Sequence, residues 1–187
     1  MTFYTHSVFG VFLSVVLLEL LNFTGLVGIY LFGSAALKFF IGAILGALVP
    51  DLDHRSSKLS RLLPFLSWFV KRLRIRHRGF THSFLGVLLV SLILSIIAVL
   101  GLGNELLIYG ILIGYVSHVF IDLFNPDGVF LFFPSDRRYS FANIKVGSRS
   151  ENLVLFILGL VLILIVYYES GSLDSLDYFL GLLRRNI

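Results

Sequence analysis

Five long apolar stretches constrain the fold of this chain more than any other feature of its sequence. They cover residues 3–21, 26–49, 84–102, 106–124 and 153–168. A helix that crosses the hydrocarbon core of a bilayer, which is roughly 30 Å thick, needs about 20 predominantly apolar residues. The middle three stretches fit this length well. The last is short for a span, so it either thins the bilayer or borrows flanking residues. We therefore predict an all-α integral membrane protein with about five transmembrane helices.

The composition agrees with a membrane protein and excludes a soluble globular domain. Hydrophobic residues make up 57% of the 187 residues and charged residues 14%. The mean hydropathy is +0.94, which is too apolar for a water-soluble protein of this size. The first apolar stretch lacks the preceding basic residues of a secretory signal, so we interpret it as a helix of the mature protein. The length predicts a single domain over residues 1–187.

Two polar segments interrupt the apolar pattern, at residues 51–83 and 126–152. Within the first, residues 62–76 are apolar at the start and basic at the end, and they are too short and too charged to span a bilayer. We predict an interfacial basic helix there, with Trp68 at the level of the lipid headgroups. The apolar core of the second segment, residues 129–134, is compatible with a short strand or with a re-entrant edge.

The distribution of basic residues predicts the orientation in the membrane. Tight turns at residues 22–25 and 101–105 join neighbouring helices into hairpins, so the amino terminus and both polar segments lie on one side. The two turns contain neither Lys nor Arg, whereas the polar segments are basic. By the positive-inside bias, the polar segments and the amino terminus face the cytoplasm from an inner membrane. The basic residues concerned are Arg55, Lys58, Arg61, Lys71, Arg72, Arg74, Arg76, Arg78, Arg137, Arg138, Lys145 and Arg149.

All five histidines map to this same side, together with several acidic residues. Asp122 lies four residues beyond His118, so the two side chains share one face of a helix. Because the chain contains no cysteine, a metal site must use imidazole and carboxylate ligands. We predict a site at one membrane face for two or three divalent metal ions, zinc by preference and manganese or iron as alternatives. The predicted ligands are His6, Asp51, Asp53, His54, His77, His82, His118 and Asp122.

Several of the predicted ligands have an ordinary structural explanation when each is taken alone. His6 is typical of an interfacial side chain or a helix cap, and residues 51–54 are typical of a turn that ends a helix. The basic residues of the first polar segment can hold the topology or bind anionic lipid. His118 and Asp122 are harder to explain, because an ionisable group inside an apolar helix costs about 2 to 3 kcal/mol on insertion scales. The convergence of so many groups on one face favours a shared metal site.

Several motifs along the chain contain these residues. They are Tyr4–His6, Leu48–His54, His77–Ser83, Gly114–Asp122, Asn125–Val129, Pro134 and Gly147–Glu151. Together they resemble the motifs of the YdjM-like family of membrane-bound, metal-dependent hydrolases, and the His77–Ser83 block is the most specific part. The family is also distantly similar to bacterial zinc-dependent phospholipases C and fungal single-strand nucleases. This chain lacks the amino-terminal Trp ligand of those enzymes and most of their length.

The resemblance implies a metal-dependent hydrolase without identifying its substrate. We expect a phosphoesterase in which Arg78 neutralises the phosphate and Glu151 acts as general base or as a further ligand. Asp53 is expected to be a ligand or an acceptor behind the ligands, and Thr81 and Ser83 to cap the third helix. Because the predicted site lies at headgroup depth, the expected partners are membrane lipids. The expected substrate is a phospholipid or another lipid-linked phosphate at the cytoplasmic face.

Other functions stay open as alternatives. A membrane metal-binding or transport protein without hydrolytic activity would use the same ligands, but transporters place them near the bilayer midplane. A partner-binding scaffold would not need the ligand set. Nucleic acid is the weaker alternative substrate, because the basic segment lacks the interleaved aromatic residues that stack on bases. The sequence gives no oligomeric state.

Overall fold

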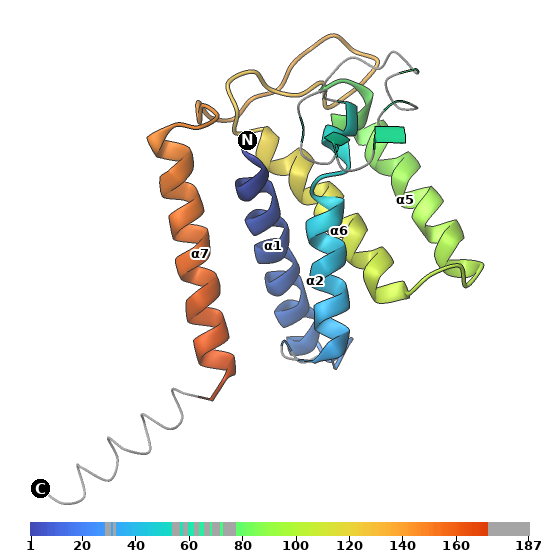
Figure 1. The fold of residues 1–187 in the computed structure, drawn as a ribbon, viewed down its shortest axis with the longest axis vertical. Helices are drawn as coiled ribbons and strands as arrows, with labels where there is room; N and C mark the ends of the chain where they lie inside the picture. The colour runs from blue at the N-terminus through green and yellow to red at the C-terminus, as the bar shows by residue number, and fades with distance from the viewer. Residues whose placement is uncertain are drawn as a thin grey trace, which may run out of the picture.

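The computed structural model describes the chain over residues 1–28, 31, 33–53, 57, 60–61, 64–65, 68, 72 and 78–171. Within these ranges the protein is helical and contains no strand, which confirms the predicted all-α fold (Figure 1). An isolated antiparallel bridge joins Val129 and Tyr139. The elements are α1 (Phe3–Phe23), α2 (Ser34–Gly46), the short 3-10 helices η1 (Pro50–Asp53) and η2 (Phe80–His82), α5 (Phe84–Val99), α6 (Glu105–Asp122) and α7 (Arg149–Glu169).

Four of the described helical segments are long and apolar enough to cross a membrane. They are Phe3–Phe23, Ser34–Leu52, Glu105–Asp122 and Arg149–Glu169. Helix α5 has 16 residues and is shorter than the predicted stretch 84–102, because Leu100 is its C-cap and Gly101 turns with a positive φ of 65°. The protein therefore has four to five membrane-crossing helices, as predicted.

The last helix is longer than its hydropathy predicts. We expected a short span over residues 153–168, but α7 has 21 residues and begins at Arg149. The hydroxyl of Ser148 accepts a hydrogen bond from the backbone amide of Glu151, which is an N-cap that starts the helix within polar sequence. The helix thus borrows flanking residues, which was one of the two expected alternatives, and hydropathy alone does not register this polar first turn.

Helices α2 and α6 form the centre of the bundle through two glycine pairs spaced four residues apart. A Cβ atom at Gly114 of α6 would lie 2.0 Å from the carbonyl oxygen of Ala43, and one at Gly46 of α2 would lie 2.0 Å from that of Ile111. Small residues at this spacing let helix backbones approach closely in a membrane. The backbones of α2 and α6 are therefore in direct contact, and α6 also packs against α1.

One end of the bundle gathers the ends of six elements. Figure 1 shows the amino terminus, the last turn of α6, the starts of α5 and α7, and the two 3-10 helices at the same end. This is the arrangement that the predicted hairpins require. Side chains far apart in the sequence can therefore meet there.

The connection from α6 to α7 folds over this end of the bundle. Its Val129 is fully buried and Leu131 accepts a hydrogen bond from the backbone amide of Phe84 at 2.8 Å. The predicted short strand or re-entrant edge at residues 129–134 is instead a non-helical connection with the bridge to Tyr139. The predicted interfacial basic helix at residues 62–76 lies mostly outside the described residues.

Candidate metal centre

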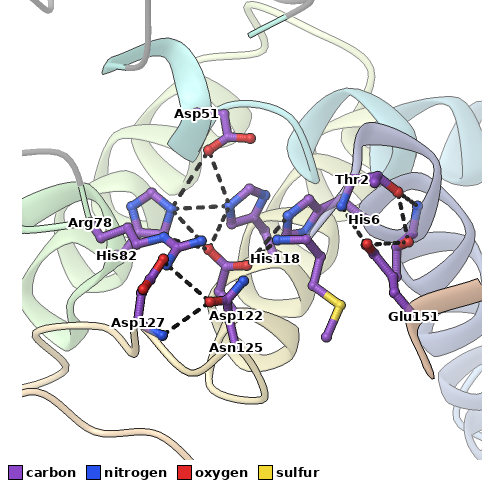
Figure 2. Close-up of polar contacts among 12 residues, drawn as sticks. Thr2, His6, Asp51, Arg78, His82, His118, Asp122, Asn125, Asp127 and Glu151 are labelled. Atoms are coloured by element: carbon purple, nitrogen blue, oxygen red, sulfur yellow. Dashed lines mark hydrogen bonds and ion pairs between the residues drawn. The ribbon is translucent and has the colours of Figure 1, made fainter. Parts of the chain in front are cut away.

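Four polar side chains from three elements meet at this end of the bundle (Figure 2). They are Asp51 of η1, His82 of η2, and His118 and Asp122 of α6, and we call them the central cluster. The Nε2 atoms of the two histidines lie 3.0 Å apart. Oδ1 of Asp51 lies 3.9 and 3.7 Å from the His82 and His118 Nε2 atoms. Oδ2 of Asp122 lies 3.6 and 3.8 Å from the same two atoms.

Asp51, His82 and His118 of this cluster offer ligand atoms that lie close enough to one another to hold one metal ion. Zinc bonds to histidine nitrogen and carboxylate oxygen of about 2.0 to 2.2 Å place neighbouring ligand atoms about 3.3 to 3.6 Å apart. The separations among these three ligand atoms, 3.0 to 3.9 Å, bracket that value. Two imidazoles with two carboxylates suit zinc, and manganese or iron can also use this donor set. The central cluster therefore has the residue types and spacing of a metal site.

The histidines of the central cluster are oriented by hydrogen bonds behind them. His118 Nδ1 donates to the carbonyl oxygen of Ala47 at 2.6 Å. A carbonyl can only accept, so the proton of neutral His118 is on Nδ1 and the Nε2 lone pair points into the cluster. His82 Nδ1 lies 3.0 Å from the Thr81 hydroxyl, and the Thr81 carbonyl accepts from the hydroxyl of Tyr115 at 2.6 Å. Backbone contacts of this kind commonly fix metal-binding imidazoles.

The sequence predicted that Thr81 and Ser83 both cap α5, and the structure gives the two hydroxyl groups different contacts. The Ser83 hydroxyl accepts from the backbone amide of Gly86 and caps α5, as predicted. The Thr81 hydroxyl instead contacts His82. A short polar motif before α5 thus starts the helix with one hydroxyl and orients a ligand with the other.

His6 of α1 adds a second group of ligands beside the central cluster. Its ring stacks on that of His118, with the ring centroids 3.7 Å apart and the planes at 6°. His6, His118 and Asp122 offer ligand atoms that lie close enough together to hold an ion. His6 is 1% exposed, and within the described part of the chain neither of its ring nitrogens has a hydrogen-bond partner. A buried polar group without a partner is costly, and a bound cation would satisfy it.

Asp122 joins the two groups through its separate oxygens. Oδ2 faces His82 and His118, whereas Oδ1 lies 3.5 Å from His6 Nε2. Oδ1 also accepts from the amino group of Met1 at 2.9 Å. A carboxylate whose two oxygens face different ligand groups is suited to bridge two ions, which is the arrangement of two-metal sites.

Arg78 brings a positive charge to the same place. Its Nε lies 3.5 Å from Asp122 Oδ2, and its Nη1 lies 3.1 Å from Oδ2 of Asp127 and 3.4 Å from Oδ1 of Asn125. The backbone at Arg78 has a φ of 60°, a left-handed conformation that costs a residue other than glycine about 1 to 2 kcal/mol. Its carbonyl oxygen accepts from the amide of Phe130, so the connection after α6 holds this conformation.

The ligands open into a polar cavity of about 440 Å³. Arg78 and Arg138 bring positive charge to its wall, and the Arg138 guanidinium donates to the backbone oxygen of Asp127 at 3.0 Å. Asp51 is the most exposed member of the central cluster, with 27% of its side chain accessible. A cavity with ligands on one wall and guanidinium groups on another can accept an anionic molecule. Its lining residues are Met1, His6, Asp51, Arg78, Asp122, Asp127, Arg138 and Val146.

Glu151 lies beside this site but outside both ligand groups. Its carboxylate accepts hydrogen bonds from the amide of Thr2, from the hydroxyl of Thr5 at 2.8 Å and from the amide of Gly147 at 2.6 Å. The contacts from Thr2 and Thr5 tie the start of α7 to the start of α1 (Figure 2). The role of Glu151 as general base or further ligand stays a prediction.

The structure brings together five of the predicted ligands, with Arg78 beside them. Asp53 ends η1, and its side chain is not described. His54 and His77 lie outside the described residues. The ligands that meet are His6, Asp51, His82, His118 and Asp122.

Sequence reasoning missed four residues of the site. The amino group of Met1 contacts the ligand Asp122, and the side chain of Asn125 contacts Arg78. Asp127 and Arg138 line the polar cavity. Asn125 and Asp127 stand in one of the quoted motifs, where the Asn125 side chain accepts from the Asp127 amide. That motif was the available signal for both, whereas Arg138 was counted only among the basic residues.

Comparison with known proteins agrees with these observations. The family described as "YdjM inner membrane protein" matches residues 1–180. YvsG of Bacillus subtilis is 35% identical over 127 residues, which cover 67% of this chain and 76% of that protein. The inner membrane protein YdjM of Escherichia coli is 37% identical over 117 residues, which cover 62% of this chain and 58% of that protein.

No solved structure matches the chain. The family match extends over nearly the whole sequence and includes every described ligand. The predicted family is thereby confirmed, and several apolar helices agree with a multi-pass protein of the inner membrane. The chain belongs to the YdjM inner membrane protein family.

Proposed function

We propose that this protein is a membrane-bound, metal-dependent hydrolase that cleaves a phosphate ester. The observation that carries the proposal is the central cluster, which opens together with His6 into a cavity that is also lined by Arg78 and Arg138. Imidazole and carboxylate donors suit a metal ion, and guanidinium groups suit a phosphate. A site that joins both is typical of phosphoesterases.

We assign the following roles to the residues of the site. Asp51, His82 and His118 would hold one ion, and His6 with Asp122 would hold another. When bound, such ions supply a hydroxide at neutral pH and neutralise charge on a phosphoryl group. Asp51, the most exposed ligand, would leave the substrate side open. Zinc is the metal that we favour, with manganese or iron as alternatives.

Arg78 would bind the phosphate in the polar cavity. In the structure its Nη1 pairs with Asp127, whose side chain is 71% exposed, so an incoming phosphate competes with a well-hydrated carboxylate. Its left-handed backbone and its contact with Asn125 hold the guanidinium over the ligands. A guanidinium can bind phosphate with two parallel hydrogen bonds, which favours a phosphate monoester or diester as substrate.

The position of the site favours a lipid-linked substrate over transport of the metal. The ligands lie at the ends of α1 and α6 and in η1 and η2, not in the middle of the bundle. Transporters bind their ions near the bilayer midplane, where both sides have access. A site at one edge instead meets the lipid headgroups, so a phospholipid or another lipid-linked phosphate can reach it from the membrane.

We place this edge on the cytoplasmic side, on the strength of the basic residues in the two polar segments. The chain has no cysteine, so single cysteines can report the topology. Ser135→Cys, in the connection after α6, should be labelled by a membrane-impermeant maleimide from the cytoplasmic side only. Leu102→Cys, in the turn between α5 and α6, should be labelled from the opposite side. The reverse pattern would overturn the assignment.

Phosphate release from phosphatidic acid in mixed micelles tests the enzyme proposal. Protein incubated with zinc should release phosphate, and a chelator should abolish the activity. His82→Ala should lower it by more than about 100-fold, since even outer partners of metal ligands are worth about 10- to 100-fold. Tyr109→Phe is the matched control, because Tyr109 is half exposed near the other end of α6.

Two outcomes would contradict the proposal. Activity that survives in His82→Ala would show that the central cluster does not perform the reaction. Tight zinc binding without hydrolysis of phosphatidic acid, or of a panel of soluble and lipid phosphoesters, would favour the alternative of a metal-binding protein without hydrolytic activity.

A further inference from the structure

A second cavity, entirely apolar, lies next to the polar one. It has a volume of about 240 Å³ and all of its lining residues are apolar. An apolar cavity of about 150 Å³ is large enough to bind a molecule the size of benzene, so this one has room for a segment of hydrocarbon chain. It lies between three helices, and its lining includes Phe9 of α1, Phe120 of α6, and Val154 and Leu158 of α7.

The cavity exists because α7 is fixed to the bundle at its start and is otherwise open. Glu151 is the one buried residue of this helix, and it ties α7 to the first turn of α1. The opposite wall is closed by aromatic rings. The rings of Phe9 and Phe120 stack with centroids 6.0 Å apart and planes at 7°, and the rings of Phe120 and Phe124 lie 5.7 Å apart.

The apolar cavity borders the polar cavity of the candidate metal centre at Met1. Met1 lines both cavities, and its amino group contacts Asp122. Ile121, the neighbour of Asp122 in α6, also lines the apolar cavity. An anionic group among the arginines and ligands and an apolar chain between α1, α6 and α7 would therefore lie next to each other, on the two sides of Met1.

We propose that the apolar cavity is the binding site for one hydrocarbon chain of a lipid whose phosphate occupies the polar cavity. The inference rests on the proposed function and extends it by naming where the lipid chain lies. The two halves of such a lipid match the two cavities in charge and polarity, because Arg78 and Arg138 line the polar one and apolar side chains line the other. A soluble phosphoester would fill only the polar half.

Photocrosslinking tests the site without depending on activity. The probe is phosphatidic acid with a diazirine near the middle of one acyl chain, presented in phosphatidylcholine vesicles that contain the full-length protein. Mass spectrometry of the labelled peptides should find the crosslinks concentrated on residues of the cavity wall, such as Phe124, Val154 and Leu158. Excess unlabelled phosphatidic acid should reduce this labelling, and excess phosphatidylcholine should not.

Two tryptophan substitutions in α7, one inside the apolar cavity and one outside it, test the same site. Val154→Trp places a large ring in the cavity, whereas Leu153→Trp places the same ring on the exposed side of α7, where Leu153 is 57% exposed. Val154→Trp should reduce the crosslinking and the release of phosphate from phosphatidic acid by at least about tenfold, the scale of discrimination by an apolar pocket. It should leave zinc content and hydrolysis of a soluble phosphoester unchanged, and Leu153→Trp should change none of these.

The outcomes separate this inference from the proposed function. Localised crosslinking that Val154→Trp abolishes would support the chain site even if the wild-type protein hydrolyses nothing. Labelling spread evenly over the lipid-facing surface of α7, or equal in the two Trp variants, would overturn it.

Discussion

Helices α2 and α6 meet backbone against backbone, whereas α7 is exposed along nearly its whole length. In the first pair, added Cβ atoms at Gly46 and Gly114 would lie 2.0 Å from carbonyl oxygens of the facing helix. In α7, no heavy atom lies within 4 Å of a Cβ added at Gly159, and Glu151 is the one buried residue. The two regions border the same site from opposite sides.

This difference separates two requirements of the candidate metal centre. Ligand atoms must be held within a few tenths of an ångström, and α6 carries two ligands on the most closely packed helix of the bundle. A lipid, by contrast, must enter from the membrane, and α7 forms a wall of the apolar cavity without filling it. Close packing thus accompanies the metal ligands, and loose packing accompanies the proposed lipid entry.

The largest effect is expected from Gly114→Ala. The new methyl group would meet the carbonyl oxygen of Ala43 and the backbone nitrogen of Ala47, which no side-chain rotation can relieve. The helices would have to separate, at a cost of several kcal/mol, because overpacking of a rigid core alone costs about 1 to 3 kcal/mol. Thermal unfolding in detergent, followed by circular dichroism, should show a large loss of stability, accompanied by loss of bound zinc.

Gly159→Ala is the matched control for this substitution. It replaces a glycine in the interior of α7, where the methyl group meets no atom within 4 Å. Its stability should stay within about 1 kcal/mol of the wild type, the usual difference between Gly and Ala in a helix. Equal effects of the two substitutions would contradict the contrast between the two regions.

An intermediate effect is expected from Glu151→Ala. The substitution removes the acceptor for two hydrogen bonds that tie α7 to the start of α1 and for a third from Gly147, just before α7. Hydrogen bonds to a charged group are worth about 1.5 to 3 kcal/mol each. The free energy of unfolding should fall by about 2 kcal/mol or more, while the zinc content stays the same. Glu169→Ala, at the exposed far end of α7, is the control.

Loss of zinc in Glu151→Ala would change the role that we assign to Glu151. It would make Glu151 part of the metal centre, as the sequence suggested when it placed this acid at the mouth of the last helix. The hydrogen bonds from Thr2, Thr5 and Gly147 would then orient a ligand rather than connect two helices.

The sequence predicted the membrane fold and the convergence of five candidate ligands for physical reasons. Apolar stretches of bilayer length are a strong signal, and their order fixes which helix ends share a side. His6, Asp51 and His82 could therefore be placed beside His118 and Asp122 without knowledge of any contact. The structure confirms that these residues meet.

Other features depend on tertiary contacts that no periodicity reports. The connection after α6 brings Asp127 and Arg138 to the cavity through hydrogen bonds such as that from Phe84 to Leu131. The start of α7 depends on the Ser148 cap, which hydropathy does not register. The glycine pairs of α2 and α6 were visible in the sequence, but their facing arrangement required the structure.

The zinc content of the purified protein shows whether the candidate metal centre binds an ion. Wild-type protein incubated with zinc, desalted and analysed by inductively coupled plasma mass spectrometry should retain at least one ion per chain. The double variant His82→Ala with His118→Ala should retain less than about one tenth of that amount, because each ligand supplies a nitrogen that the remaining carboxylates cannot replace. Helix α6 should persist in the variant, since alanine is a strong helix former. Equal zinc content in the wild type and the double variant would contradict the existence of the metal centre.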